Sequence, residues 1–162
     1  MNPSLRNMTS VFFVREDGLL CLYRIGSRVA NRKYVGACGG HFEENELCSP
    51  YACALREMRE ELGLSEADVE DLRLRYMTVR YMGHEIRQNY YFFGRLKEER
   101  KLCSTEGELR FFTWEELKNI DMPVSARHMM DHYLSVGRFT GEVYAGVTEP
   151  GGSKFVTLQY FE

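Results

Sequence analysis

The sequence predicts a single α/β domain, and two observations lead to this prediction. The chain has 162 residues, which is the length of one domain and enough to bury a hydrophobic core. Several runs rich in β-branched and aromatic residues, typical of strands, alternate with segments whose apolar residues have helical spacing. We therefore expect one domain over residues 1–162, in which residues 137–162 could add an extra C-terminal β-hairpin.

The composition excludes several classes of function. The net charge is −3, so there is no basic excess that would suggest binding to a long nucleic acid. The five cysteines are odd in number and include no C-x2-C pair, which argues against a disulfide framework and a structural zinc site. The first residues lack the apolar core of a signal peptide, and no run approaches the roughly 20 apolar residues of a membrane span. We expect a cytoplasmic protein that does not bind a membrane.

The N-terminal third is predicted to form strands. Residues 9–14 (TSVFFV) are typical of a short buried strand, and residues 19–24 (LLCLYR) of its hairpin partner. The tight turn at residues 16–18 (EDG) joins them. A polar loop over residues 25–33 then leads to another short strand at residues 34–38.

A helix is predicted from Pro50 to Leu62. Proline suits the first turn because its missing N–H would have no partner there. Ser49 is a suitable N-cap, and Gly63 is a natural C-terminal stop. The expected buried stripe consists of Ala52, Leu55, Met58 and Leu62.

Strands are predicted again after this helix. Residues 65–71 are acidic and could form a short helical turn. Residues 72–81 and 85–96 are rich in β-branched and aromatic residues, which predicts a long hairpin at the centre of the sheet. A charged loop over residues 97–106 leads to a further strand at residues 108–112.

The last part of the chain is predicted to contain two helices and two strands. A capping box at Thr113 opens a short helix over residues 114–119. A longer helix follows over residues 125–136, and two strands are expected at 141–147 and 154–161. The expected buried stripe of the longer helix consists of Ala126, Met129, Met130, Tyr133 and Leu134.

The helix over residues 50–62 carries three carboxylates on one face. Glu57 precedes Glu60 by three residues and Glu61 by four, and like charges at this spacing repel one another. One interpretation is a solvated acidic face balanced by neighbouring arginines. The other is a metal site, because Mg²⁺ prefers oxygen ligands and is held by a few carboxylates plus substrate phosphates. The Gly39-Gly40 turn could add a carbonyl oxygen to such a site.

The stretch from Gly40 to Leu64 resembles the Nudix box, G-x5-E-x7-R-E-U-x-E-E-x-G-U, in which U is a bulky aliphatic residue. The matching positions are Gly40, Glu46, Arg56, Glu57, Met58, Glu60, Glu61, Gly63 and Leu64. The chain departs from the pattern in one place, since nine residues rather than seven separate Glu46 from Arg56. We interpret the difference as a lengthened loop. The resemblance implies an α/β/α sandwich around a mixed β-sheet.

The resemblance also implies a hydrolase that uses Mg²⁺, with Mn²⁺ as an alternative ion. Its expected substrate is a nucleotide in which a phosphoanhydride bond is cleaved. Glu60 and Glu61 are the expected metal ligands, and Glu57 is either a third ligand or the general base. The carbonyl of Gly39 or Gly40 is a further expected ligand, and Arg56 is expected to orient the glutamates.

Five side chains outside the helix are further candidates. Glu108 is the expected additional acidic ligand, with Glu106 as second choice. Arg24 matches a phosphate-contacting arginine, and Tyr34 an aromatic residue of MutT-like nucleotide hydrolases. His41 follows the two glycines and is expected to line the substrate site.

Three polar side chains have weaker functional interpretations. His128 and His132 are spaced i, i+4 on a predicted helix and could hold a metal, but no third ligand is evident, so ordinary histidines are favoured. Asn89 could bind a purine edge, although a hydrogen bond within the sheet is favoured.

The resemblance leaves the substrate open. The leading named candidate is 8-oxo-dGTP, cleaved to a monophosphate and pyrophosphate, and the alternatives are ADP-ribose or a dinucleotide polyphosphate. An isopentenyl-diphosphate isomerase is a less favoured reading, kept open by Cys38 beside the glycines. A non-catalytic ligand-sensing domain is disfavoured, because all three helix glutamates are present. A homodimer is expected, since this fold often forms one.

Overall fold

The computed structural model describes residues 2–26, 30–98 and 101–158, and within these ranges eight strands form one mixed sheet. The order of the strands is β3-β2-β1-β5-β4-β7-β8, and β6 pairs with β2. The strands are β1 (Ser4–Arg15), β2 (Gly18–Arg24), β3 (Lys33–Gly36), β4 (Val69–Tyr81), β5 (Glu85–Leu96), β6 (Gly107–Thr113), β7 (Tyr144–Glu149) and β8 (Gly152–Thr157). The two longer helices are α1 (Pro50–Leu62) and α2 (Val124–Ser135).

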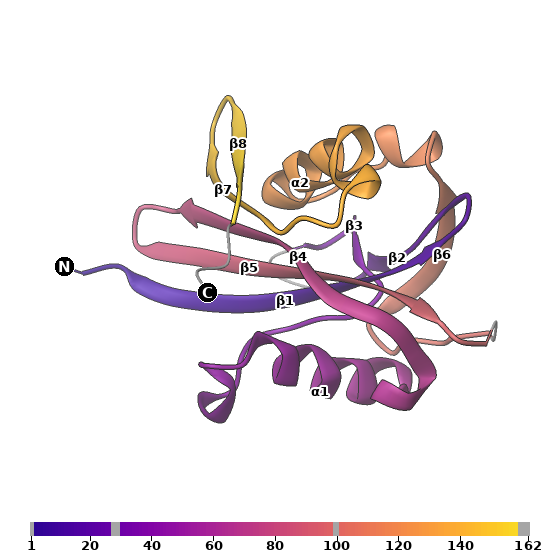
Figure 1. Ribbon diagram of the computed structural model, residues 1–162. Helices are drawn as coiled ribbons and strands as arrows, with labels where there is room; N and C mark the ends of the chain where they lie inside the picture. Colours follow the sequence, from indigo (N-terminus) through magenta and orange to yellow (C-terminus); the bar gives the residue numbers. More distant parts are fainter. Residues whose placement is uncertain (1, 27–29, 99–100, 159–162) are drawn as a thin grey trace.

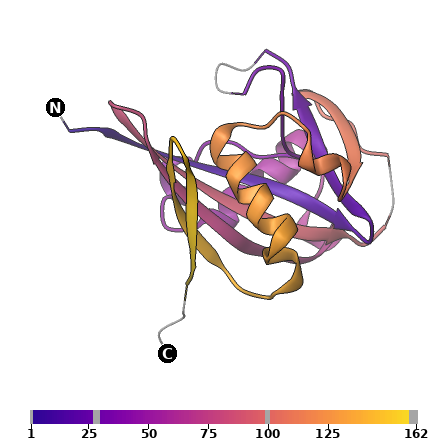
Figure 2. The ribbon, with the colours of Figure 1, turned by 90° about the horizontal axis from the view of Figure 1, so that it is seen from above.

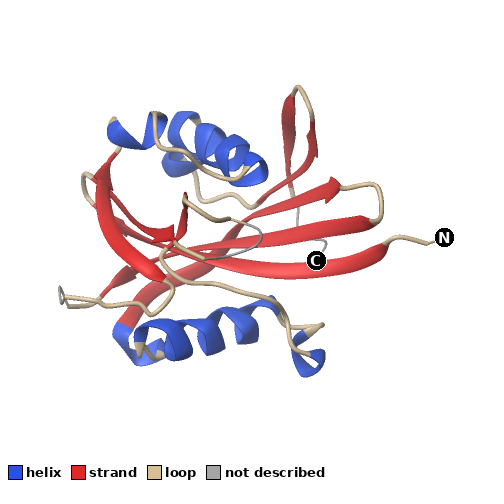
Figure 3. Ribbon diagram, turned by 180° about the vertical axis from the view of Figure 1, so that it is seen from behind, coloured by secondary structure: helices blue, strands red, loops and turns tan. Residues whose placement is uncertain are grey.

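The two helices cover opposite faces of the sheet, which confirms the predicted α/β/α sandwich (Figures 1 and 3). Strand β1 is parallel to β5, and β4 is parallel to β7, whereas the other pairs are antiparallel. The predicted central hairpin is the β4–β5 pair. Seen from above, α2 lies over the sheet with the β7–β8 hairpin beside it (Figure 2). No helix in the described ranges is long and apolar enough to cross a membrane.

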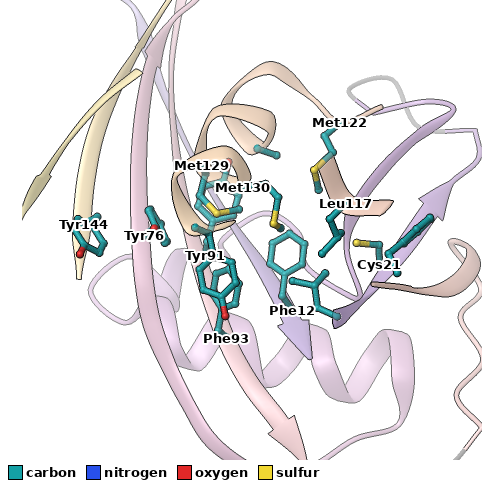
Figure 4. Packing of buried hydrophobic residues seen from close by; sticks show 14 residues of the cluster. Phe12, Cys21, Tyr76, Tyr91, Phe93, Leu117, Met122, Met129, Met130 and Tyr144 are labelled. Carbon is teal, nitrogen blue, oxygen red and sulfur yellow. The ribbon is translucent and has the colours of Figure 1, made fainter. Parts of the chain in front are cut away.

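Each face of the sheet has its own hydrophobic cluster, because successive side chains of a strand point to opposite faces. Along β1, Phe12 belongs to the cluster beneath α2, whereas Val11 and Phe13 belong to the cluster beneath α1. Along β5, Tyr91 and Phe93 again lie on the α2 side. Figure 4 shows the α2 cluster, in which methionines of the helix pack against these rings.

Helix α1 has the bounds that its capping residues predict. The Ser49 hydroxyl accepts a hydrogen bond from the Ala52 N–H at 3.3 Å, and Gly63 ends the helix with a φ of 65°. The predicted buried stripe is partly wrong, since Ala52 is exposed. The buried residues of the helix are Cys53, Ala54, Glu57 and Met58. The helix is therefore rotated so that one carboxylate, that of Glu57, faces the interior.

The later elements differ from the prediction mainly at their ends. The short helix expected over residues 114–119 is a 3-10 turn, Glu116–Lys118. Asp121 binds the Lys33 ammonium group at 2.7 Å through its carboxylate and the Tyr34 N–H at 2.8 Å through its carbonyl. These bonds place the residues after the turn against β3. The predicted strand over 141–147 is shorter, and the end of the one over 154–161 lies outside the described residues.

Two histidines connect α2 to the C-terminal part of the sheet. The Nδ1 atom of His132 lies 2.7 Å from the Tyr76 hydroxyl, and that of His128 lies 2.9 Å from the Ser153 hydroxyl. Their side-chain contacts thus involve hydroxyl groups of two different strands, β4 and β8. Burial lowers the pKa of His132 below its usual value.

The histidine contact predicts a pH effect on stability. Because the pKa of His132 is lower in the folded protein, the unfolded chain takes up its proton first as the pH falls through about 6.5. Acidification therefore lowers the free energy of unfolding of the native protein. In His132→Gln this contribution to the fall is absent. We expect the free energy of unfolding in urea to fall less between pH 7.5 and 5.5 in this variant. Equal falls in both proteins would contradict the interpretation.

Candidate functional site

The backbone from residue 38 to residue 41 lies against β1. The Thr9 N–H donates to the Gly40 carbonyl at 2.9 Å, and the Val11 N–H donates to the Cys38 carbonyl at 2.9 Å. Gly39 has a φ of 147°, and a Cβ atom there would lie 2.2 Å from the Thr9 carbonyl oxygen. Only glycine fits such a close approach in this conformation. The loop is thus held to a central strand.

Gly40 forms the contact between this loop and α1. A Cβ atom on Gly40 would lie 2.4 Å from Oε1 of Glu57. The absent side chain therefore leaves room for the carboxylate of a buried glutamate directly beside the loop backbone. Strand β1, the glycine loop and α1 are consequently packed in three successive layers at this point.

Arg56 connects the loop to three carboxylates. Its Nε and Nη2 atoms donate to the two oxygens of Glu46 at 2.7 and 3.0 Å, and its Nη1 atom donates to Glu57 at 2.8 Å and to Glu60 at 2.9 Å. Its Nη2 atom also donates to the His41 carbonyl at 2.9 Å. Arg56 therefore contacts two of the helix glutamates that it was predicted to orient, and the orienting role itself stays a prediction. The lengthened loop still brings Glu46 to the helix, and the hydrogen bonds from Arg56 lower the pKa of Glu46.

The carboxylates of α1 differ in their environment. Glu57 is buried, and burial raises its pKa despite the opposing hydrogen bond from Arg56. Glu60 is exposed. Glu61 accepts a hydrogen bond from the Gly39 N–H at 3.1 Å. Burial raises the pKa of Glu61 to about 7, and the charge of Glu57 adds to this rise.

The donor atoms of this region fit a hard divalent cation. They are carboxylate oxygens and a backbone carbonyl, which are the ligands that Mg²⁺ prefers. The buried Glu57 and the half-buried Glu61 both have raised pKa values and lie close together, and a bound cation would favour their charged forms. Within the described ranges, however, no three His, Cys, Asp or Glu side chains are gathered around one point. Arg56 holds Glu57 and Glu60, so a cation would compete with its guanidinium group.

A cavity of about 310 Å³ opens beside Glu61 and the glycine loop. Its floor is the α2 face of β1 and β5, where Ser10 and Asn89 lie, and the first turn of α2 forms a wall. The cationic side chains that line it are Arg24, Lys33, Arg80 and Arg87. The cavity therefore combines an acidic end at α1 with several positive charges.

Two of the predicted substrate-binding residues line this cavity. Arg24 donates to Glu106 at 3.1 Å, and its buried Nε atom has no hydrogen-bond partner among the residues that the structure describes. His41 also lines the cavity and contacts Arg6, with its Nε2 atom 2.8 Å from Nη2 of the arginine. Burial and the charge of Arg6 lower the pKa of His41. Tyr34 instead packs against Tyr23 and Phe112 at ring distances of 4.9 and 4.8 Å, beside the α2 cluster.

The two acidic candidates, Glu106 just before β6 and Glu108 within it, occupy different places. Glu108 is exposed and is paired in register with Tyr23. Glu106, the second choice, binds Arg24 and its charge contributes to the raised pKa of Glu61. The geometry thus favours Glu106 over Glu108 as the acidic group nearest the carboxylates of α1.

Sequence reasoning missed the arginines of the β4–β5 hairpin. Arg80 and Arg87 are directly opposite each other in the register of the two strands. Alternation along β5 places the side chain of Arg87 on the same face as that of Asn89. The Asn89 side chain donates to the Thr78 hydroxyl at 3.4 Å, which is the hydrogen bond within the sheet that was favoured over purine binding. Asn89 also lines the cavity, so the same alternation could have identified Arg87.

The geometry predicts that Arg56 is required for stability. Replacing it with glutamine removes the partner of buried Glu46, and an uncompensated buried charge costs about 3 kcal/mol. We expect Arg56→Gln to lower the free energy of unfolding in urea by roughly that amount. Arg59→Gln, which changes an exposed arginine of the same helix, is the control. A similar small effect of both variants would contradict the prediction.

Comparison with known proteins identifies one family. The NUDIX domain model matches residues 5–133. No curated protein matches the chain.

Solved structures share the fold at low sequence identity. The mutator MutT protein from Bacillus halodurans is 20% identical with a TM-score of 0.64, and the match covers 93% of this chain and 97% of that one. The MutT protein from Methanosarcina mazei Go1 is 14% identical with a TM-score of 0.68, covering 86% and 99%. The NUDIX domain of Shewanella oneidensis NrtR, complexed with ADP ribose, is 10% identical with a TM-score of 0.59, covering 86% and 90%. These likenesses show the fold alone.

Proposed function

Because the chain belongs to the NUDIX domain family and is a Nudix hydrolase that acts on phosphoanhydrides, we propose that it cleaves a nucleoside triphosphate or a related nucleotide with the help of Mg²⁺. The leading candidate is 8-oxo-dGTP, which would give a monophosphate and pyrophosphate. One observation carries this proposal: Glu61 lines the acidic end of a cavity that several cations also line, and Arg56 binds the neighbouring carboxylates of Glu57 and Glu60 on the same helix.

Glu57, Glu60, Glu61 and the Gly40 carbonyl are the groups that would hold the ion. Mg²⁺, or Mn²⁺ in its place, supplies neutralisation of phosphate charge and a positioned water molecule when bound. The Gly40 carbonyl accepts a hydrogen bond from the Thr9 N–H at 2.9 Å and a contact from the Cys53 thiol at 3.9 Å. Because a thiol is a weak donor, an ion could replace it as the second partner of this oxygen.

The residues of the chain itself orient the acids and accept a proton. Arg56 fixes Oε1 of Glu57 and Oε2 of Glu60 through charge-assisted hydrogen bonds. The Gly39 N–H fixes Oε2 of Glu61. A general base works best when its pKa lies near the working pH. Glu57 and Glu61 both have raised pKa values, so either carboxylate could accept the proton of an attacking water molecule.

Arg24 is the proposed contact to the substrate phosphates. Its buried Nε atom has no partner within the described residues, and an unpaired buried donor is costly. A phosphate oxygen in the cavity would accept this hydrogen bond and supply the missing partner. Glu106 holds the other end of the guanidinium group through Nη2.

The second candidate substrate is ADP-ribose or a dinucleotide polyphosphate. The observation that favours it is the fold similarity to the NrtR NUDIX domain, which was solved with ADP ribose. A non-catalytic ligand-sensing role is the remaining alternative. The cavity volume of about 310 Å³ suits a small molecule. A homodimer and a cytoplasmic location also belong to the proposal.

A hydrolysis panel tests the proposed activity. It would contain 8-oxo-dGTP, the ordinary dNTPs, ADP-ribose and a diadenosine polyphosphate, each with Mg²⁺, and pyrophosphate and orthophosphate would be measured separately. We expect Glu61→Gln to lower kcat by about 10²- to 10⁴-fold, as loss of a catalytic acid or base does. Glu66→Gln, an exposed glutamate beyond the helix, is the control.

The outcomes of the panel separate the candidates. Pyrophosphate release from 8-oxo-dGTP that depends on Glu61 would support the leading substrate. Turnover of ADP-ribose or the dinucleotide instead would keep the chemistry and replace the substrate. Absence of any turnover that depends on Glu61 would contradict the hydrolase proposal and favour a sensing role.

Gly40 provides a test of the loop geometry. Gly40→Ala would place Cβ 2.4 Å from Oε1 of Glu57, so the carboxylate must move. We expect Mn²⁺ affinity, measured by electron paramagnetic resonance, and kcat/KM both to fall by about tenfold, which corresponds to the loss of one good ligand contact. Gly141→Ala, where a Cβ atom meets nothing within 4 Å, is the control. Unchanged Mn²⁺ affinity in Gly40→Ala would remove Glu57 and Gly40 from the proposed metal site.

A further inference from the structure

Three arginines lie in one row across the sheet, at the end of the cavity away from Glu61. Arg6 of β1 is opposite Arg87 of β5 in the parallel register, and Arg87 is opposite Arg80 of β4 in the antiparallel register. Residues that are opposite each other in neighbouring strands point to the same face. Arg80 and Arg87 line the cavity on this face, and Arg6 contacts His41, which also lines it.

The row carries more positive charge than its surroundings neutralise. Glu85 is bound by Arg87, and it also accepts a hydrogen bond from Arg6 at 3.4 Å. Arg80 has no carboxylate partner within the described part of the chain. Like charges directly opposite each other in a sheet destabilise it. One carboxylate is thus paired with two of the three guanidinium groups, and the arrangement favours an anionic ligand.

Strand β1 gives the separation between this row and the acidic end of the cavity. Glu61 binds the N–H of Gly39, and Gly39 lies against Thr9. Arg6 precedes Thr9 by three residues of the same strand, which corresponds to about 10 Å at the usual rise of a strand. In a nucleoside triphosphate, the phosphate next to the cleaved bond is joined to it directly. It would therefore lie beside the acidic end and would not reach the arginine row.

We propose that the arginine row (Arg6, Arg80 and Arg87) binds a second phosphate of the substrate, separate from the diphosphate that is cleaved. The substrate is then a nucleotide derivative that carries an additional phosphate outside the phosphate chain that is cleaved. Arginine suits this role because its planar group binds phosphate through two parallel hydrogen bonds. The inference rests on the proposed function for the position of the cleaved bond.

The groups between the two ends of the cavity agree with such a substrate. Ser10 and Asn89 line the cavity, carry no charge and lie closer to the acidic end than the arginine row does. A sugar or a base has neutral hydrogen-bonding groups of the same kind. The order along the cavity is therefore acidic, neutral and cationic, which matches a metal-bound diphosphate, a nucleoside and a further phosphate.

Pairs of compounds that differ by one phosphate test the inference. Coenzyme A and its 3′-dephospho form make one pair, and NADPH and NADH make the other. We expect the phosphorylated member to have the higher kcat/KM, and the ratio within each pair to fall by about tenfold in Arg80→Gln, the effect of losing one charge-assisted contact. Arg95→Gln, an exposed arginine of the same hairpin whose partners are Glu70 and Asp71, should keep the ratio of the native protein.

A binding measurement separates this inference from the proposed function. Adenosine 3′,5′-bisphosphate should bind more tightly than AMP by calorimetry, and Arg80→Gln should remove the difference. That result supports the arginine row even if no compound is hydrolysed. Equal binding of both compounds, or a ratio that Arg80→Gln leaves unchanged, overturns the inference. Turnover without any phosphate preference overturns it as well, while the hydrolase proposal stands.

Discussion

The bonds of Arg56 hold the candidate site together. One guanidinium group binds Glu46 from the loop, Glu57 and Glu60 from its own helix, and the carbonyl of His41. These partners come from three successive segments of the chain, and Arg56 fixes their positions relative to one another. Buried ion pairs contribute little net stability, but their geometry is specific. The positive charge of Arg56 also offsets the electrostatic repulsion between these three carboxylates.

Much of the fold could be predicted because its signals are local. Ser49, Pro50 and Gly63 each have a chemical reason to be where they are, so α1 has the predicted ends. The buried face of α1 could not be predicted equally well. Apolar periodicity assumes that carboxylates face water, whereas Glu57 is buried against Gly40 and Arg56.

The parts of the candidate site that consist of residues close together in the sequence could be predicted. The parts that combine residues from distant strands could not. Arg6 and Arg87 are far apart in sequence and meet only through the parallel β1–β5 pairing, which single-sequence patterns do not specify. The positions of Glu106 and Glu108 depend on a related feature. Gly107 has a φ of 156°, and a Cβ atom there would lie 2.0 Å from the Tyr23 carbonyl oxygen. The strand alternation therefore does not extend back across Gly107 to Glu106.

The attachment of the glycine loop to β1 has a consequence for local unfolding. The amides of Thr9 and Val11 donate to the loop carbonyls of Gly40 and Cys38, and β1 lies between β2 and β5 in the middle of the sheet. Amide hydrogens in such a position exchange with solvent only when a large cooperative unit opens. The loop therefore unfolds only when this part of the sheet unfolds, and both have the same free energy of opening. Most surface loops open separately. Its shape is set during folding, before any ligand binds.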